Sequence, residues 1–269
     1  MSASLVLRLA GPLQAWGSSS QFNRRETDEL PTKSGIVGLL AAAQGRRRED
    51  PIEDLLGLQL AVRIDQPGTL LRDFHTVSTL DGAPLLSATL SAKGQQKPVT
   101  SGKTTHVTHR FYLQDAVFVA AVGAADRTLL EALAHALRHP VFPLALGRRA
   151  CVPTQPLLVR EGTSDLWDGE PVAVIARVPW QASARVQRRA TRTGGSRELA
   201  VTADRPALVP AGALTDSRVD VPSGFAPGQR HLRTREVIHV WVTPPSDHAP
   251  AGSGGTPPHD PFDLLGGEK

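Results

Sequence analysis

Two runs of residues with the pattern of β-strands, 59–65 and 116–122, stand on either side of a long polar stretch. In residues 59–65 apolar and polar side chains alternate, as in a strand with one buried face, whereas residues 116–122 are continuously apolar, as in a strand buried on both faces. The polar stretch, residues 73–112, is rich in Thr, Ser, Gly, Lys and His and is too long for an ordinary connection. It therefore predicts an extended β-hairpin or a protruding insertion with a basic centre.

Further segments place this insertion in a familiar order. Residues 4–10 form a strand-like apolar run. One helix is expected between Pro31 and Gly45, and a second is expected after its cap at Asp126. A last strand is expected near residues 155–160. The order strand, helix, strand, insertion, strand, helix, strand predicts an α+β chain with a βαββαβ ferredoxin-like layout, in which the insertion replaces a simple hairpin.

The second half of the chain is less regular. Residues 171–178 and 236–242 have the composition of strands. Between them, residues 185–197 contain five arginines and no acidic residue, which is typical of a solvated, mobile loop or of a segment that follows a nucleic-acid backbone. The sequence does not decide between these two interpretations. Residues after Pro244 are rich in Pro, Gly and Ser, and we expect them to be disordered.

Composition excludes several classes of protein. The single cysteine, Cys151, excludes an internal disulfide framework and a Cys-rich zinc site, and it is compatible with the reducing cytoplasm that we expect for this chain. No run approaches the ~18 apolar residues of a membrane span. The net charge is +4, and most of the 30 basic residues are arginine, which suits phosphate but also follows from GC-rich codon usage. Neither a metal nor a cofactor is expected.

Two turns that contain glycine are candidate anion sites. The first is the loop from Gly11 that leads into the first helix, where free N–H groups and the helix dipole favour an anion. The second is a glycine–arginine turn after the second helix. The alternative for each is a helix cap or a surface loop with solvated charges. Their candidate ligands are Arg24, Arg25, Lys33 and Ser34 in the first turn and Gly147, Arg148 and Arg149 in the second.

The polar insertion carries a third group of candidates: His75, His106, His109, Lys103, Arg110 and Tyr112. Metal-independent RNA cleavage needs a base, an acid and a cation for the developing charge, and His, Tyr and Lys can fill those roles. Histidines in a polar insertion are more often surface residues or groups that contact RNA. A zinc site is less well supported, because His106 and His109 lack nearby Cys or paired acidic ligands.

Three segments carry a family resemblance. They are residues 5–17 (LVLRLAGPLQAWG), 31–43 (PTKSGIVGLLAAA) and 146–151 (LGRRAC). In this order and spacing the chain resembles the CasD subunits of type I-E CRISPR Cascade complexes. The resemblance is good over residues 4–160 and weaker in the C-terminal part.

The resemblance implies a fold and a function. The fold would be a ferredoxin-like (modified RRM) domain over residues 1–160, with a long β-hairpin thumb at about 74–110. A small C-terminal β-region would follow at 161–243, and a disordered tail at 244–269. The function would be that of a non-catalytic, antiviral subunit that holds the 5′ handle of the crRNA and caps the complex. It would contact the backbone subunit and the large subunit, and target DNA only through the assembled complex.

The resemblance and the residue pattern together give one set of RNA-binding candidates: Trp16, Arg24, Arg25, Lys33, Ser34, Lys103, His106, Arg110, Gly147, Arg148 and Arg149. Two alternatives remain open. Related subunits of another Cascade subtype are the crRNA-processing endoribonuclease, so the insertion could form a metal-independent RNase site. The chain could also be an assembly module whose basic residues contact acidic protein faces.

Overall fold

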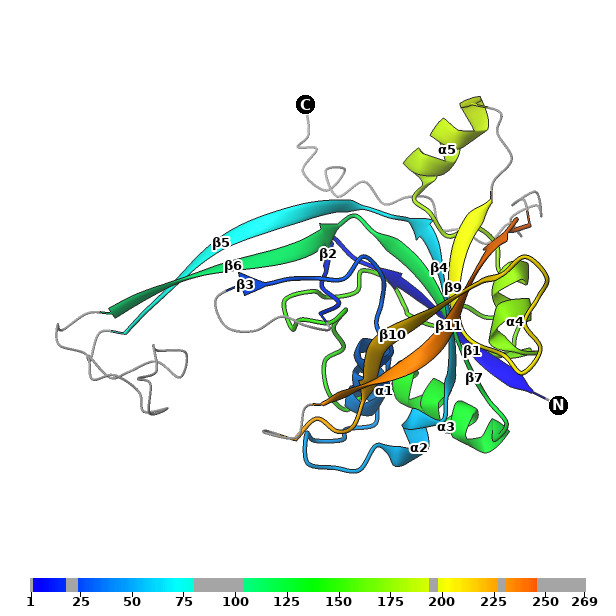
Figure 1. The fold of residues 1–269 in the computed structure, drawn as a ribbon, viewed down its shortest axis with the longest axis horizontal. Coiled ribbons are helices and arrows are strands. Elements are labelled where there is room, and N and C mark those ends of the chain that lie inside the picture. Colours follow the sequence, from blue (N-terminus) through cyan, green and yellow to red (C-terminus); the bar gives the residue numbers. More distant parts are fainter. Residues whose placement is uncertain (1, 18–23, 80–103, 194–197, 227–230, 246–269) are drawn as a thin grey trace, which may run out of the picture.

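A seven-stranded antiparallel sheet lies at the centre of the computed structural model, which describes residues 2–17, 24–79, 104–193, 198–226 and 231–245 (Figure 1). The strand order is β10-β11-β9-β4-β7-β1-β8. The bounds are β1 (Ala3–Ala10), β4 (Gln59–Gln66), β7 (Val117–Ala124), β8 (Leu166–Asp168), β9 (Leu199–Asp204), β10 (Leu214–Pro222) and β11 (Leu232–Val242). The predicted α+β class is confirmed.

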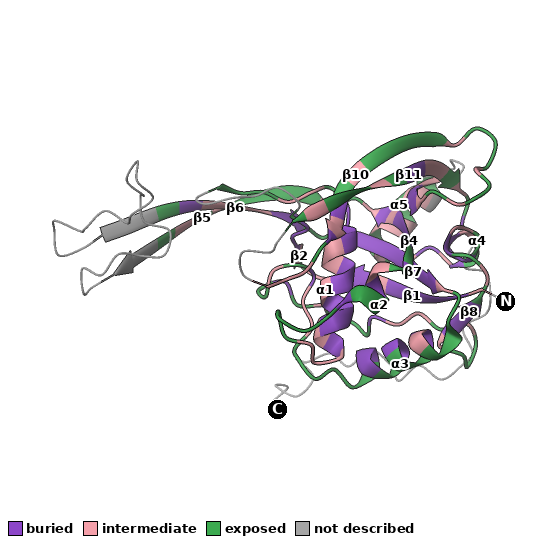
Figure 2. Cartoon of the chain, turned by 60° about the horizontal axis from the view of Figure 1, so that its bottom comes forward, coloured by how far each residue is buried: buried purple, intermediate pink, exposed green. Residues whose placement is uncertain are grey.

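The middle strands are buried on both faces, as their composition predicts. In β1, Leu5 and Leu7 belong to the core beneath the helices α1 (Lys33–Ala43), α2 (Glu53–Leu56) and α3 (Arg127–Arg138). Val6, between them, belongs to a second core beneath α4 (Pro171–Arg177). Successive side chains of a strand point to opposite faces, so the continuous apolar run follows from two covered faces. Figure 2 shows this buried layer between the helices.

Both predicted helices are confirmed, and each begins at a capping side chain. The Thr32 hydroxyl accepts a hydrogen bond from the Gly35 N–H at 3.1 Å, and the Asp126 carboxylate accepts one from the Thr128 N–H at 2.9 Å. Helix α1 ends before Gly45, whose φ of +79° suits glycine. These caps fix where each helix begins and ends on the first face of the sheet.

The polar insertion begins and ends as a long hairpin, which we call the thumb. Strands β5 (Thr69–Thr79) and β6 (Thr104–Gln114) pair antiparallel along their whole length, and Figure 1 shows them projecting from the sheet. The short strands β2 (Leu13–Gln14) and β3 (Arg24–Arg25) also pair with β6. The predicted hairpin is therefore confirmed, with strands that extend beyond residues 74–110. The basic centre, including Lys103, lies outside the described residues.

Two predicted strands are wrong. Near residues 155–160 only Leu158 forms a bridge, with Leu7 of β1, because Pro153 and Pro156 cannot donate a hydrogen bond to the sheet. The regular edge strand is instead β8. Residues 171–178 form helix α4, because Pro171 is well suited to the first helical turn and the helix buries Val174 and Ile175 against the second face. Burial of this helix overrides the strand preference of its β-branched residues.

The C-terminal strands extend the same sheet. Strand β9 pairs with β4, and β11 pairs with β9 and β10, so the predicted strand at 236–242 is confirmed as part of β11. Residues 184–193 form helix α5 (Ala184–Thr193), so this part of the arginine run is not a loop. The expected disordered tail falls largely on residues 246–269, which lie outside the described residues.

Candidate nucleic-acid interface

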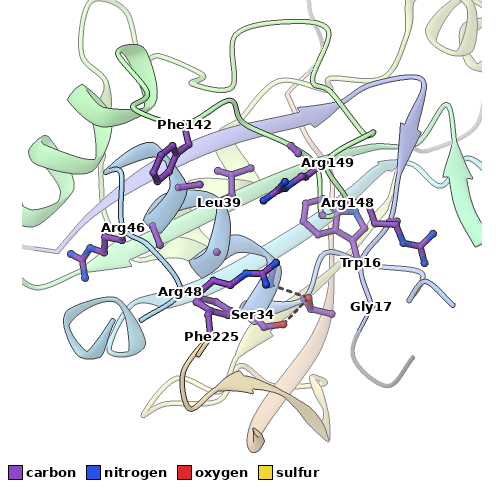
Figure 3. A pocket seen from close by; sticks show the side chains of 18 of the residues that line it. Trp16, Gly17, Ser34, Leu39, Arg46, Arg48, Phe142, Arg148, Arg149 and Phe225 are labelled. Carbon is purple, nitrogen blue, oxygen red and sulfur yellow. Dashed lines mark hydrogen bonds between the residues drawn. The ribbon is translucent and has the colours of Figure 1, made fainter. Parts of the chain in front are cut away.

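A groove with a volume of about 920 Å³ runs beside α1 (Figure 3). Its floor is one side of α1, which presents small residues: Ser34, Gly35, Gly38, Ala41 and Ala42. Its walls come from the loop before α1, the arginines after α1, the segment after α3 and the segment after β10. These wall residues include Trp16, Gly17, Arg46, Arg47, Arg48, Phe142, Gly147, Arg148, Arg149 and Phe225.

The glycine–arginine turn is locked against the first loop. Gly147 has a φ of +89°, and a Cβ at this position would lie 1.7 Å from the carbonyl oxygen of Ala15. The Ala15 N–H also donates to the Leu146 carbonyl at 3.1 Å. Only glycine fits such a close approach of two backbones. The two turns that the sequence singles out therefore lie side by side on one wall.

Arg148 fastens this wall to the base of the thumb. Its guanidinium donates to the carbonyl of Phe111 at 2.9 Å, and to those of Arg25 at 2.7 Å and Glu26 at 3.0 Å. It also lies over the ring of Tyr112, with 4.8 Å to the ring centroid. Figure 3 shows Arg148 directed away from α1. Its donors are largely committed to protein groups, so its main role in this structure is to position the wall.

Three arginines on the rim have uncommitted side chains. Arg47, Arg48 and Arg149 are exposed, and within the described ranges their side chains make neither an ion pair nor a hydrogen bond. Arg46, by contrast, is held by the Asp54 carboxylate, whose hydrogen bond raises the pKa of Arg46 and lowers that of Asp54. The three free guanidinium groups are the ones available for an external anion.

The N-terminus of α1 is already occupied by a carboxylate side chain of the same protein. The Lys33 N–H donates to the Asp220 carboxylate of β10 at 2.9 Å, and the Lys33 ammonium pairs with Asp204 of β9 at 2.9 Å. Arg235 of β11 hydrogen-bonds both carboxylates. Burial would raise the pKa of Asp220, but its bonds to Arg235 and the Lys33 N–H lower it below the ordinary value. Lys33 is therefore part of a buried ion network and does not line the groove.

Trp16 and Ser34 belong to the groove but also support it. Trp16 is buried, and its Nε1 donates to the Gln14 side chain at 3.0 Å. A Cβ on Gly35 would lie 2.7 Å from the Trp16 ring, so the ring packs directly on the helix start. The Ser34 hydroxyl lies 3.2 Å from that of Thr32. Both residues line the groove from α1 and the loop before it.

The candidates on the thumb whose side chains the structure describes are not gathered into one site. Arg24 is exposed, lies over Phe111 and bonds Glu26 at 2.6 Å, while Arg110 has a buried Nε without a hydrogen-bond partner among the described residues. His75 pairs with Thr108 in the register, so His75 and the next residue along β6, His109, point to opposite faces of the hairpin. His106 lies in β6 opposite Val77, but its side chain, like Lys103, is outside the description.

Sequence reasoning missed several residues of the groove. Arg46, Arg47 and Arg48 are not among the predicted candidates, although a run of three arginines next to a small-residue helix face is a usable signal. Phe142 and Phe225 had no local signal. Phe225 reaches α1 only through tertiary packing, 3.5 Å from a Cβ built on Gly38.

The described part of the chain holds no cluster of three or more His, Cys, Asp or Glu residues that could bind a metal. Its helices include none that is long and apolar enough to span a membrane.

Comparison with known proteins identifies the class that this fold and groove define. The family model for CRISPR-associated proteins of the Cas5 type matches residues 4–238, so the chain belongs to the Cas5 family. Among individual proteins, it is 36% identical over 172 residues to the CRISPR system Cascade subunit CasD of Escherichia coli (strain K12), covering 59% of this chain and 71% of CasD. The predicted resemblance to CasD is confirmed.

Solved structures agree with this assignment. A chain of a CRISPR RNA-guided surveillance complex matches with a TM-score of 0.66 and 32% identity, over 90% of this chain and 91% of that one. A chain described as a crystal structure of a Cas protein matches with a TM-score of 0.61 and 28% identity, over 89% and 95% of the two chains.

Proposed function

We propose that this chain is a non-catalytic subunit of a Cascade surveillance complex and that its groove holds the 5′ handle of the crRNA. The relatives support the assembly, since one is a Cascade subunit and another belongs to an RNA-guided surveillance complex. The observation that carries the proposal is the set of three uncommitted arginines, Arg47, Arg48 and Arg149, around the groove. Guanidinium groups bind phosphate oxygens in a planar, two-pronged geometry.

The floor of the groove suits a nucleotide chain. Ser34, Gly38 and Ala42 are small and partly exposed, so phosphates or splayed bases can come close to α1 between the rings of Trp16, which packs on Gly35, and Phe225, which lies beside Gly38. Phosphate contacts would set the register of the RNA, and backbone groups with Phe142 and Phe225 would contact its bases. Trp16, Ser34, Gly147 and Arg148 would shape this path rather than bind phosphate directly.

The finer features of the proposal follow from the same resemblance. Residues 1–160 would be a ferredoxin-like (modified RRM) domain, and the strand order β1-β7-β4 supports it, since β7 lies between β1 and β4. The edge strand next to β1 is β8, at Leu166–Asp168, so the layout extends beyond residue 160. The thumb would contact the adjacent backbone subunit, and another face would contact the large subunit. Target DNA would be reached through the assembled complex, in the cytoplasm, as part of antiviral defence.

Geometry favours binding over RNA cleavage. A general acid and a general base must both reach one phosphodiester. Among the candidates whose side chains are described, His75 and His109 lie on opposite faces of the thumb, and Tyr112 is buried beneath Arg148.

The test measures binding and cleavage together. The full chain is titrated against a labelled RNA that begins with the 5′ handle from the repeat array of the source genome. Each phosphate contact on a single strand contributes about 0.7 to the slope of log Kd against log salt. Arg48→Gln with Arg149→Gln should therefore lower the slope by about 1.4. Arg127→Gln, on α3 outside the groove, is the control with the same charge change per site.

Two results would count against the proposal. If the double variant binds like the wild type, the groove does not hold the handle. If the RNA is cut without metal and His109→Ala abolishes the cutting, the chain is an endoribonuclease.

A further inference from the structure

Helix α5 presents an arginine stripe that the groove does not use. Arg185, Arg188, Arg189 and Arg192 stand at positions i, i+3, i+4 and i+7, which lie on one face of a helix. All four are exposed, and α5 contains no acidic residue.

None of the four arginines is neutralised by another described residue. Within the residues that the structure describes, they make no ion pair and no side-chain hydrogen bond. Other arginines of the chain are committed: Arg63, for example, is fully buried and bonds Asp65 and three backbone carbonyls. The stripe is therefore a distinct feature and not a general consequence of an arginine-rich composition.

The opposite side of α5 fixes the direction of the stripe. Val186 and Ala190 are partly buried, and Gln187 donates to the carbonyls of Trp180 at 2.9 Å and Ala182 at 3.1 Å. Ser183, just before the helix, donates to the Gln66 side chain at the end of β4 at 2.9 Å. These contacts hold one side of α5 against the body, so the arginines face outward.

Like charges at these spacings repel one another along the helix. Arg185 and Arg189, and likewise Arg188 and Arg192, are four residues apart, and such pairs destabilise a helix when no acidic side chain lies among them. An external polyanion would relieve this repulsion. A protein partner fits less well, since arginines at the centre of a stable protein interface are accompanied by aromatic and apolar side chains, which this face lacks.

We propose that the arginine stripe of α5 binds the phosphodiester backbone of a nucleic acid, at a site separate from the groove. From Arg185 to Arg192 the helix rises about 10 Å, which is the axial distance of about three successive nucleotides of one DNA strand. Figure 1 shows α5 on the other side of the sheet strands from α1, and none of its residues lines the groove. The strand bound at α5 is therefore not the segment held beside α1.

The test compares two fourfold variants of the full chain. One replaces Arg185, Arg188, Arg189 and Arg192 by glutamine, and the other replaces the same residues by lysine, which keeps the charge. Each is titrated by fluorescence anisotropy against a 20-bp non-cognate DNA duplex, a 20-nucleotide RNA without handle sequence, and the handle RNA, from 50 to 300 mM salt. The three probes distinguish the source of the backbone.

The glutamine variant should lower the salt slope by about two to three for the backbone that the stripe binds, and weaken that binding about tenfold at low salt. The lysine variant should keep most of the slope, and the handle RNA should bind both variants within about twofold of the wild type through the groove. The proposal fails if the glutamine variant binds duplex and handle-free RNA like the wild type. It also fails if the lysine variant loses as much binding, because positive charge is then not the cause.

The outcome is independent of the proposed function. Arg48→Gln with Arg149→Gln should weaken binding of the handle RNA. The same variant should leave unchanged the slope of log Kd against log salt for the nucleic acid that α5 binds. If the groove variant has no effect while the α5 variants behave as expected, the groove proposal fails and the α5 proposal stands.

Discussion

Asp220→Ala is the change that best tests how the groove is held together. Asp220, Asp204, Lys33 and Arg235 form a buried network of two acids and two bases that ties the start of α1 to strands β9, β10 and β11. The Asp220 side chain is 4% exposed. Its removal leaves one positive charge uncompensated in the interior and the Lys33 N–H without its acceptor.

The expected loss of stability follows from the uncompensated charge that the variant leaves in the network. Breaking a buried ion pair by removing one partner costs about 3–5 kcal/mol. Because Asp204 still pairs with both bases, the lower end applies, and we expect a loss of about 3 kcal/mol in the free energy of unfolding. For a chain of this size, 1 kcal/mol corresponds to about 2–4 °C, so the Tm should fall by about 6–12 °C. Handle RNA should also bind more weakly, since the segment that carries Phe225 follows β10 directly.

Two controls make the measurement decisive. Asp216→Ala lies on the same strand, where the side chain is 65% exposed and 3.8 Å from His239, and it should move the Tm by less than about 2 °C. Asp220→Ala combined with Arg235→Met removes one acid and one base, leaves Lys33 paired with Asp204, and should recover part of the loss. The measurement is the Tm of the wild type, the two single variants and the double variant in the same buffer. A single variant Asp220→Ala that melts within about 2 °C of the wild type would refute this account of the network.

Two other outcomes are expected. Gly147→Ala should destabilise the chain and weaken handle binding, because its Cβ would lie 1.7 Å from the Ala15 oxygen at a φ of +89°. Gly162→Ala, at a φ of +60° with open space around it, should cost only the ~1–2 kcal/mol of the left-handed conformation, and equal costs for the two would contradict this. The pKa of Asp220 is lowered in the folded protein, so its ionised carboxylate stabilises the fold at pH values above the ordinary carboxyl pKa of ~3.9. This stabilisation is lost as the pH falls through the pKa that Asp220 has in the folded protein. The Tm difference between wild type and Asp220→Asn should therefore shrink below about pH 4, and a constant difference from pH 7 to 2 would contradict it.

Local signals made much of the fold predictable. The caps at Thr32 and Asp126 and the apolar strands act within a few residues, so the sequence alone locates α1, α3, β1, β4 and β7. Predictions failed where distant contacts decide. Residues 171–178 are a helix because of the sheet face that they cover, and the C-terminal strands β9 and β10 carried no clear pattern.

The candidate site shows the same division. A tight turn at Gly147 could be expected from the sequence, but its close packing against Ala15 could not, because that contact joins two distant segments. The role of Lys33 could not, since its partner Asp220 lies 187 positions away and fills the helix N-terminus that appeared open to an external anion. The rim arginines were visible in the sequence, but only the fold shows that Arg46 is paired and Arg48 is not.

Whether an arginine side chain is bound by protein groups therefore says more about function than the number of arginines does. Arg63, Arg148 and Arg235 donate most of their hydrogen bonds to carboxylates and carbonyl groups of the protein, and their removal should mainly reduce stability. Exposed arginines without protein partners contribute little to the fold, so their clustering calls for an external anion. Two such clusters, beside α1 and along α5, face different surroundings in one chain. If both proposals hold, the subunit binds two stretches of phosphodiester backbone at once, and the salt dependence of each is set by its own arginines.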